Sequence, residues 1–108
     1  MKKVKKKESL TKDLLNTFLT ETAVVIHSAF EDSSKTVAFV DVDESWTDEK
    51  KLETAFMLTN SIEGAWYTSN KVKYVGPGKS CRSTSVGDMI MLNNGKKFKC
   101  EHIGWSEV

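Results

Sequence analysis

Apolar residues along this chain recur at two different spacings, and the change of spacing predicts where helices give way to strands. Near the start, Leu10, Leu14 and Phe18 mark one helical face, which predicts a short helix over residues 10–20. The preceding residues 1–8 hold five lysines. Because these like charges repel one another, we expect a disordered tail there.

The next apolar segments have the character of strands. "TAVVIHSAF" (22–30) is rich in β-branched residues, and "TVAFVDVD" (36–43) ends in alternating apolar and acidic positions. The polar stretch "EDSSK" (31–35) lies between them as a turn. Together they predict a β-hairpin.

A second, stronger helical pattern follows. Thr47 is a suitable N-cap, and Asp48 and Glu49 place acid in the first turn, where the helix dipole favours it. Gly64 is placed to end the helix. The buried stripe is expected to comprise Leu52, Ala55, Phe56, Thr59 and Ile62.

The last third predicts a connector and a second hairpin. Residues 65–80 form the connector, with "VKYV" as a short strand inside it. "MIML" and "KFKCEHIGW" are strands joined by "NNGK", which is typical of a type I′ loop. The expected fold is α+β, a small antiparallel sheet of two hairpins with two helices. A curled, barrel-like sheet is the alternative, and residues 9–108 form one domain.

Composition narrows the setting of the protein. The net charge is +1, so the chain outside the five tail lysines carries about −4 (+1 minus 5). No apolar run is long enough for a membrane span or a signal peptide. We therefore expect a protein that stays in the cytoplasm of the cell that makes it, with Cys81 and Cys100 reduced.

Arginine occurs once, at Arg82, against fifteen lysines. An AT-rich coding bias explains the lysines and makes the single arginine informative, because lysine cannot copy its planar fork. Arg82 could clamp a carboxylate, either Asp88 or the C-terminus. It could also bind an anionic ligand together with Ser83, Thr84 and Ser85, or anchor a protein contact.

Motifs for catalysis or cofactors are weak. "GPGKS" resembles the end of a phosphate-binding loop, but Lys73 stands where that motif needs glycine. Two cysteines and two histidines lack the spacing of zinc ligands. The hydroxyls of residues 83–85 or Cys81 could act as nucleophiles with His102 as base, although turn chemistry is the simpler interpretation. We expect no catalytic residue, metal or cofactor.

Aromatic residues suggest a binding surface instead. Trp66 and Tyr67 directly follow the long helix, where an exposed loop is expected, and Trp105 lies near the C-terminus. These side chains either seal the edges of a small core or present an aromatic surface to a base, a ring ligand or a protein.

Three stretches carry a resemblance. "LETAFMLTNSIEGAW" (52–66), "RSTSVGDMIML" (82–92) and "KFKCEHIGWSEV" (97–108) resemble small uncharacterised proteins of bacteriophages and mobile elements. The resemblance covers about the last half of the chain and implies a phage origin, with no known activity.

These observations favour a small phage-encoded accessory protein that binds a host protein in the host cytoplasm, for counter-defence or host modulation. The alternative is a nucleic-acid module, whose lysine tail contacts phosphate weakly while Trp66 and Tyr67 stack on bases. An enzyme ranks third. The sequence leaves the oligomeric state open.

Overall fold

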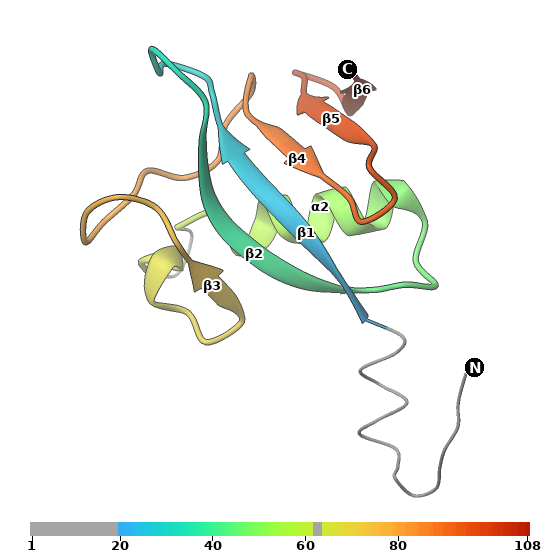
Figure 1. Ribbon diagram of the computed structural model, residues 1–108, viewed down its shortest axis with the longest axis horizontal. Helices are drawn as coiled ribbons and strands as arrows, with labels where there is room; N and C mark the ends of the chain where they lie inside the picture. Colours follow the sequence, from blue (N-terminus) through green and yellow to red (C-terminus); the bar gives the residue numbers. More distant parts are fainter. Residues whose placement is uncertain (1–19, 62–63) are drawn as a thin grey trace, which may run out of the picture.

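The computed structural model describes residues 20–61 and 64–108, and a single antiparallel sheet dominates them (Figure 1). The strands are β1 (Thr20–His27), β2 (Lys35–Asp43), β3 (Val72–Tyr74), β4 (Met89–Met91), β5 (Lys97–Cys100) and β6 (Trp105–Glu107). Their order in the sheet is β3-β2-β1-β4-β5-β6. The remaining elements are the helix α2 (Asp48–Leu58) and the 3-10 turn η1 (Trp66–Thr68).

The expected fold class is wrong in two respects. The described residues contain one α-helix, not two, and the two hairpins belong to one six-stranded sheet that stays open, with β3 and β6 as its edges. The predicted tail 1–8 and the predicted helix 10–20 lie outside the described residues, apart from Thr20, which begins β1. Among the described helices, none is long and apolar enough to cross a membrane.

The predicted first hairpin is confirmed. β1 and β2 pair antiparallel from Thr20 opposite Asp43 to His27 opposite Lys35, with a register shift between Val25 and Ile26. Val25 lies opposite Ile90 of β4, so β1 also joins the first hairpin to the second. β1 therefore lies inside the sheet, hydrogen-bonded to β2 on one side and to β4 on the other.

Helix α2 starts as predicted and ends earlier. The Thr47 side chain accepts a hydrogen bond from the Lys50 N–H at 3.2 Å. The last helical residue is Leu58, six positions before Gly64. Thr59 ends the helix because its carbonyl accepts the N–H of the distant Thr84 at 3.0 Å, while its hydroxyl donates to the Ala55 carbonyl at 2.8 Å.

The second hairpin is a three-stranded meander. Gly95 has a positive φ of 89°, and its N–H donates to the Leu92 carbonyl. The Leu92 N–H in turn donates to the Lys96 carbonyl, which closes the hairpin loop. The loop therefore has three residues rather than the predicted two-residue type I′ turn. Gly104, with φ of 74°, then turns the chain so that β6 pairs with β5.

The core lies between α2 and one face of the sheet. Its members are buried hydrophobic side chains: Ala23, Val25, Val37, Ala38, Val40, Val42, Leu52, Ala55, Trp66, Val72, Ile90 and Leu92. A largely buried ion pair, Lys51 Nζ to Glu21 Oε1 at 3.0 Å, adds a polar link between α2 and β1. The opposite face of the sheet carries no helix among the described residues (Figure 1).

Candidate functional site

Arg82, the single arginine of the sequence, forms a bidentate ion pair with a carboxylate, one of the roles that the sequence analysis considered for it. Arg82 Nη1 donates to Asp88 Oδ2 at 2.7 Å and Nη2 donates to Asp88 Oδ1 at 2.9 Å, which confirms the predicted bidentate contact. The other N–H groups donate to Glu31 Oε2, to the Ser83 carbonyl and to the Ala29 carbonyl. Five donors in one plane satisfy five acceptors, which an ammonium group could not do.

Asp88 is completely buried and receives more than the arginine. Its carboxylate also accepts from the backbone N–H groups of Ser28, Ala29 and Ser85 at 2.8–2.9 Å. Burial by itself would raise the pKa of the Asp88 carboxyl, but the bonds from Arg82 and the three N–H groups outweigh it and lower that pKa. Asp88 therefore stays ionised and ties the β1–β2 turn to the turn before β4.

The turn carrying Phe30 shows how closely this end of the sheet is held. Phe30 has a left-handed backbone (φ 64°) and a side chain 85% exposed, and the Arg82 guanidinium lies over its ring at 5.2 Å. A Cβ on Gly87 would lie 2.9 Å from the Ala29 Cβ, so the two turns touch where only glycine fits. We call Arg82, Asp88 and their hydrogen-bond partners the arginine clasp.

A chain of buried hydroxyls continues inward from the clasp. The Thr59 hydroxyl donates to a carbonyl, so it must accept the Thr84 hydroxyl, 2.7 Å away. Thr84 Oγ1 then accepts from His27 Nε2–H at 2.9 Å, which leaves His27 Nδ1 unprotonated. That nitrogen accepts from the Cys81 thiol, whose sulfur lies 3.6 Å away.

The Cys81–His27 pair is chemically quiet in this environment. Burial lowers the pKa of His27 and raises the pKa of the Cys81 thiol, so both groups are neutral near pH 7. The hypothesis of a nucleophile activated by His102 pairs the wrong residues, because His27 is the histidine beside Cys81. Within residues 20–61 and 64–108, no three acidic, histidine or cysteine side chains are grouped to hold a metal ion.

The structure brings most of the predicted binding residues together, but it turns them inward. Trp66 is 2% exposed and its Nε1–H donates to the Arg82 carbonyl at 2.9 Å. Tyr67 is half-buried against Trp66, and Trp105 packs apart from them on Phe56. Of the two alternatives left open by the sequence, these aromatic side chains therefore seal the edge of the core and do not form an exposed surface.

The hydroxyl residues beside Arg82 also act locally. Ser83 Oγ accepts from the Ser61 N–H at 2.9 Å, and the Ser85 hydroxyl donates to the Ser83 carbonyl at 3.4 Å. Thr84 is 2% exposed and belongs to the hydroxyl chain. These contacts cap backbone and side-chain groups of the protein itself, which leaves an external anionic ligand little to bind.

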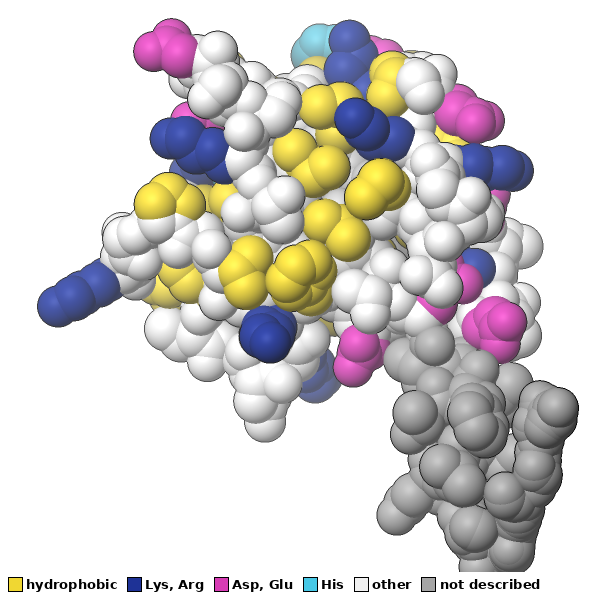
Figure 2. Space-filling view, in the orientation of Figure 1, with side chains coloured by type: hydrophobic (Ala, Val, Ile, Leu, Met, Phe, Trp, Pro, Cys, Tyr) yellow, Lys and Arg dark blue, Asp and Glu magenta, His cyan; other side chains and the backbone are white. Residues whose placement is uncertain are grey.

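A surface that the sequence analysis missed lies on the uncovered face of the sheet. Side chains on this face alternate with the core positions, and five of them are apolar and half-buried. They are Val24, Ile26, Phe39, Met89 and Met91. Figure 2 shows hydrophobic side chains gathered in a patch across the middle of this face. We call this patch and its bordering lysines the open face.

Lysines border the patch on both sides. In one row across five strands, Lys73, Phe39, Val24, Met91 and Lys97 lie opposite one another in turn. The next row places Ile26 opposite Met89, and Met89 opposite Lys99. The open face is thus an apolar strip with positive charge at either end.

A hollow of about 500 Å³ deepens one end of the row. Its lining combines the Phe39 ring with charged and polar side chains from the β2 and β3 region. The lining residues are Thr22, Phe39, Asp41, Asn70, Lys71, Val72 and Lys73. Two lysines, Lys71 and Lys73, stand at its wall.

The open face had a signal in the sequence. Outward positions of a one-sided sheet are normally polar, whereas "AVVI" in β1 and "MIM" in β4 are apolar at every position. Such runs indicate a strand that is covered on both faces. Here α2 covers one face only.

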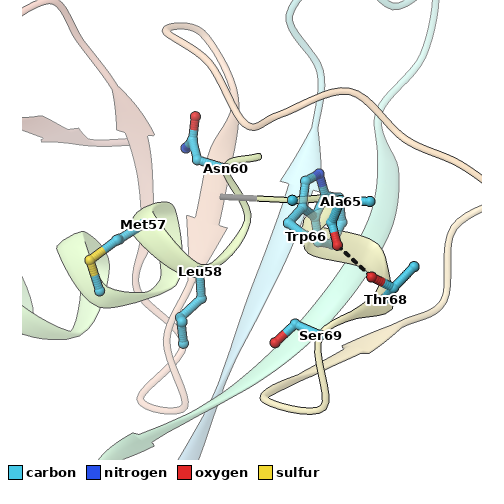
Figure 3. A pocket seen from close by; sticks show the side chains of 8 residues that line it. Met57, Leu58, Asn60, Ala65, Trp66, Thr68 and Ser69 are labelled. Carbon is cyan, nitrogen blue, oxygen red and sulfur yellow. Dashed lines mark hydrogen bonds between the residues drawn. The ribbon is translucent and has the colours of Figure 1, made fainter. Parts of the chain in front are cut away.

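A second hollow, of about 480 Å³, lies at the end of α2 (Figure 3). Met57 and Leu58 line it from the helix, Asn60 from the segment after the helix, and Ala65 and Trp66 from η1 and the residue before it. Its lining residues come from both sides of positions 62–63 in the sequence, which are outside the described ranges, so no site is assigned there. Comparison with known protein families, with curated proteins and with solved structures finds no match for this chain.

Proposed function

We propose that this protein acts by binding another protein through the open face of its sheet. The observation that carries the proposal is the strip of five apolar side chains bordered by lysines on a face that no described element covers. Contiguous exposed apolar surface rimmed by polar groups is typical of interaction sites. The phage origin expected from the sequence would make that partner a host protein.

The composition of the strip favours a protein over a nucleic acid. Phe39 is its single aromatic residue, while Val24, Ile26, Met89 and Met91 are aliphatic or flexible thioether side chains. Such side chains pack well on apolar groups of a protein, whereas bases need aromatic platforms. Trp66, which the nucleic-acid alternative would need for stacking on bases, is buried.

Binding rather than catalysis is also favoured by the state of the reactive groups. The Cys81–His27 pair is held neutral, and the hydroxyls of Thr59 and Thr84 are used in internal hydrogen bonds. A cysteine nucleophile reacts as the thiolate, and the raised pKa of Cys81 keeps the thiol protonated near pH 7 even though His27 lies beside it.

Two matched substitutions test this proposal. Met91→Glu places a charge in the strip, while Met57→Glu places the same charge on α2, where Met57 is 56% exposed on the other side of the sheet. Affinity purification from host cells should recover a partner with the wild type and Met57→Glu but not with Met91→Glu. Recovery that is equal for both variants would contradict the proposal.

The same two variants also test the alternative, that the open face binds nucleic acid. Filter binding of single-stranded DNA and RNA at rising salt should show weak association that salt abolishes, and Met91→Glu should affect it no more than Met57→Glu. Tight, salt-resistant binding that requires Phe39 would make the open face a nucleic-acid platform instead.

A further inference from the structure

We propose that the open face recognises a partner segment with an apolar block bracketed by acidic residues at both ends. The inference rests on the proposed function and adds the chemistry of the partner. It follows from the order of side chains in a single row of the sheet: Lys73, then Phe39, Val24 and Met91, then Lys97.

The dimensions of the row set the spacing of the acidic groups. Neighbouring strands lie about 4.8 Å apart, so the four steps from β3 to β5 span about 19 Å. A segment that reaches both lysines needs carboxylates separated by about six residues if extended, or about thirteen if helical. The apolar block between them covers the middle three positions of the row.

Charge on this face selects against other occupants. Lysines at positions 71, 73, 97 and 99 outnumber the one acidic residue of the hollow, Asp41. A second copy of the protein would bring an equally positive face, so like charges would oppose face-to-face pairing.

The hollow beside Phe39 gives the two ends of the segment different roles. Lys71 and Lys73 stand together at its wall with the Asn70 amide, so a carboxylate there meets several donors next to an apolar ring. At the opposite end, Lys97 is half-buried beside Met91 and Lys99 is exposed. We therefore expect the end that enters the hollow to be an apolar or aromatic residue followed by an acid.

Three synthetic peptides with the same leucine and phenylalanine block test the inference. One is bracketed by glutamates at both ends, one by glutamates at one end only, and one by lysines at both ends. The doubly acidic peptide should bind most tightly, and Lys73→Glu or Lys97→Glu should each weaken it about two- to fivefold. Lys50→Glu on α2 is the control and should leave binding unchanged.

A charge exchange makes the test specific. The double variant Lys73→Glu with Lys97→Glu should lose the doubly acidic peptide and gain the lysine-bracketed one, with both effects weakened by salt. Unfolding in denaturant establishes that each variant is folded. Equal binding of all three peptides, or no recovery with the lysine-bracketed peptide, would overturn the inference.

The two proposals can fail separately. If no peptide binds while Met91→Glu still abolishes partner capture, the bracketed segment is wrong and the open face remains the binding surface. If partner capture is insensitive to Met91→Glu, the proposed function fails first. Tighter binding to anionic lipid vesicles than to any peptide would also overturn the inference, because the lysines would then serve a membrane surface.

Discussion

The arginine clasp and the open face contain similar chemistry, positive charge beside apolar side chains, yet they use it in opposite ways. In the clasp, every donor of Arg82 and the carboxylate of Asp88 are satisfied by groups of the same chain. On the open face, the lysines border an apolar strip that faces outward. The difference teaches that a rare residue such as Arg82 indicates a binding site only when its hydrogen-bond donors are not already satisfied by groups of the same chain.

A substitution in the arginine clasp should lower the free energy of unfolding more than a substitution on the open face. Asp88→Asn should destabilise the protein by about 3–5 kcal/mol, because it removes the fully buried carboxylate of the ion pair and leaves the Arg82 guanidinium with Glu31 alone as a charge partner. It also replaces one acceptor oxygen by a donor that faces N–H groups. Denaturant unfolding of Asp88→Asn measures the loss. A cost below about 1 kcal/mol would show that the clasp is not what holds the two turns.

Acid should weaken the same region through His27. Its folded pKa lies below the ordinary 6.5, so between these values only the unfolded chain takes up the proton. Stability is thus complete above pH 6.5 and falls as pH drops toward the folded pKa. Asp88, whose pKa is lowered, adds a further loss below its ordinary 3.8.

A histidine substitution isolates the first step of that pH dependence. Gln at position 27 can keep the hydrogen bond to Thr84 but cannot take up a proton. Unfolding midpoints of His27→Gln and wild type at pH 7.5 and pH 5 should differ in slope, with the variant nearly flat. An equal loss in both proteins would place the acid sensitivity elsewhere.

Arg82→Lys should have a smaller effect than Asp88→Asn. Lysine keeps the charge beside Asp88 but cannot make the two parallel bonds or reach the Ala29 and Ser83 carbonyls at once. We expect a loss of about 1–2 kcal/mol, which corresponds to a fall in melting temperature of about 4–12 °C. Thermal melts measure it, and an unchanged melt would remove the clasp from the account of stability.

Much of the fold follows from local patterns. The β1–β2 hairpin, the Thr47 cap, the short strand β3 and the Arg82–Asp88 fork were all predictable, because each depends on residues near in sequence or on a single rare side chain. The early end of α2 was not, because a buried link between Thr59 and Thr84 replaces helical hydrogen bonds there.

The site was harder to predict than the fold. The sequence left open whether Trp66 seals the core or faces outward, and it lies inside because the chain after η1 folds back so that the Arg82 carbonyl accepts its indole N–H. The open face requires the pairing of β1 with β4, which joins Val24 to Met91 across a long sequence separation. The one sequence signal for the open face is that β1 and β4 carry apolar residues at the positions that face either side of the sheet.

The most direct test compares Arg82→Lys with Met91→Glu in two measurements, unfolding by denaturant and capture of the partner. The account predicts that Arg82→Lys loses stability and keeps the partner at a temperature where it is folded. Met91→Glu should keep stability to within about 1 kcal/mol and lose the partner. If Arg82→Lys instead abolishes capture without lowering stability, while Met91→Glu binds as the wild type does, the clasp is the binding site and the central claim is wrong.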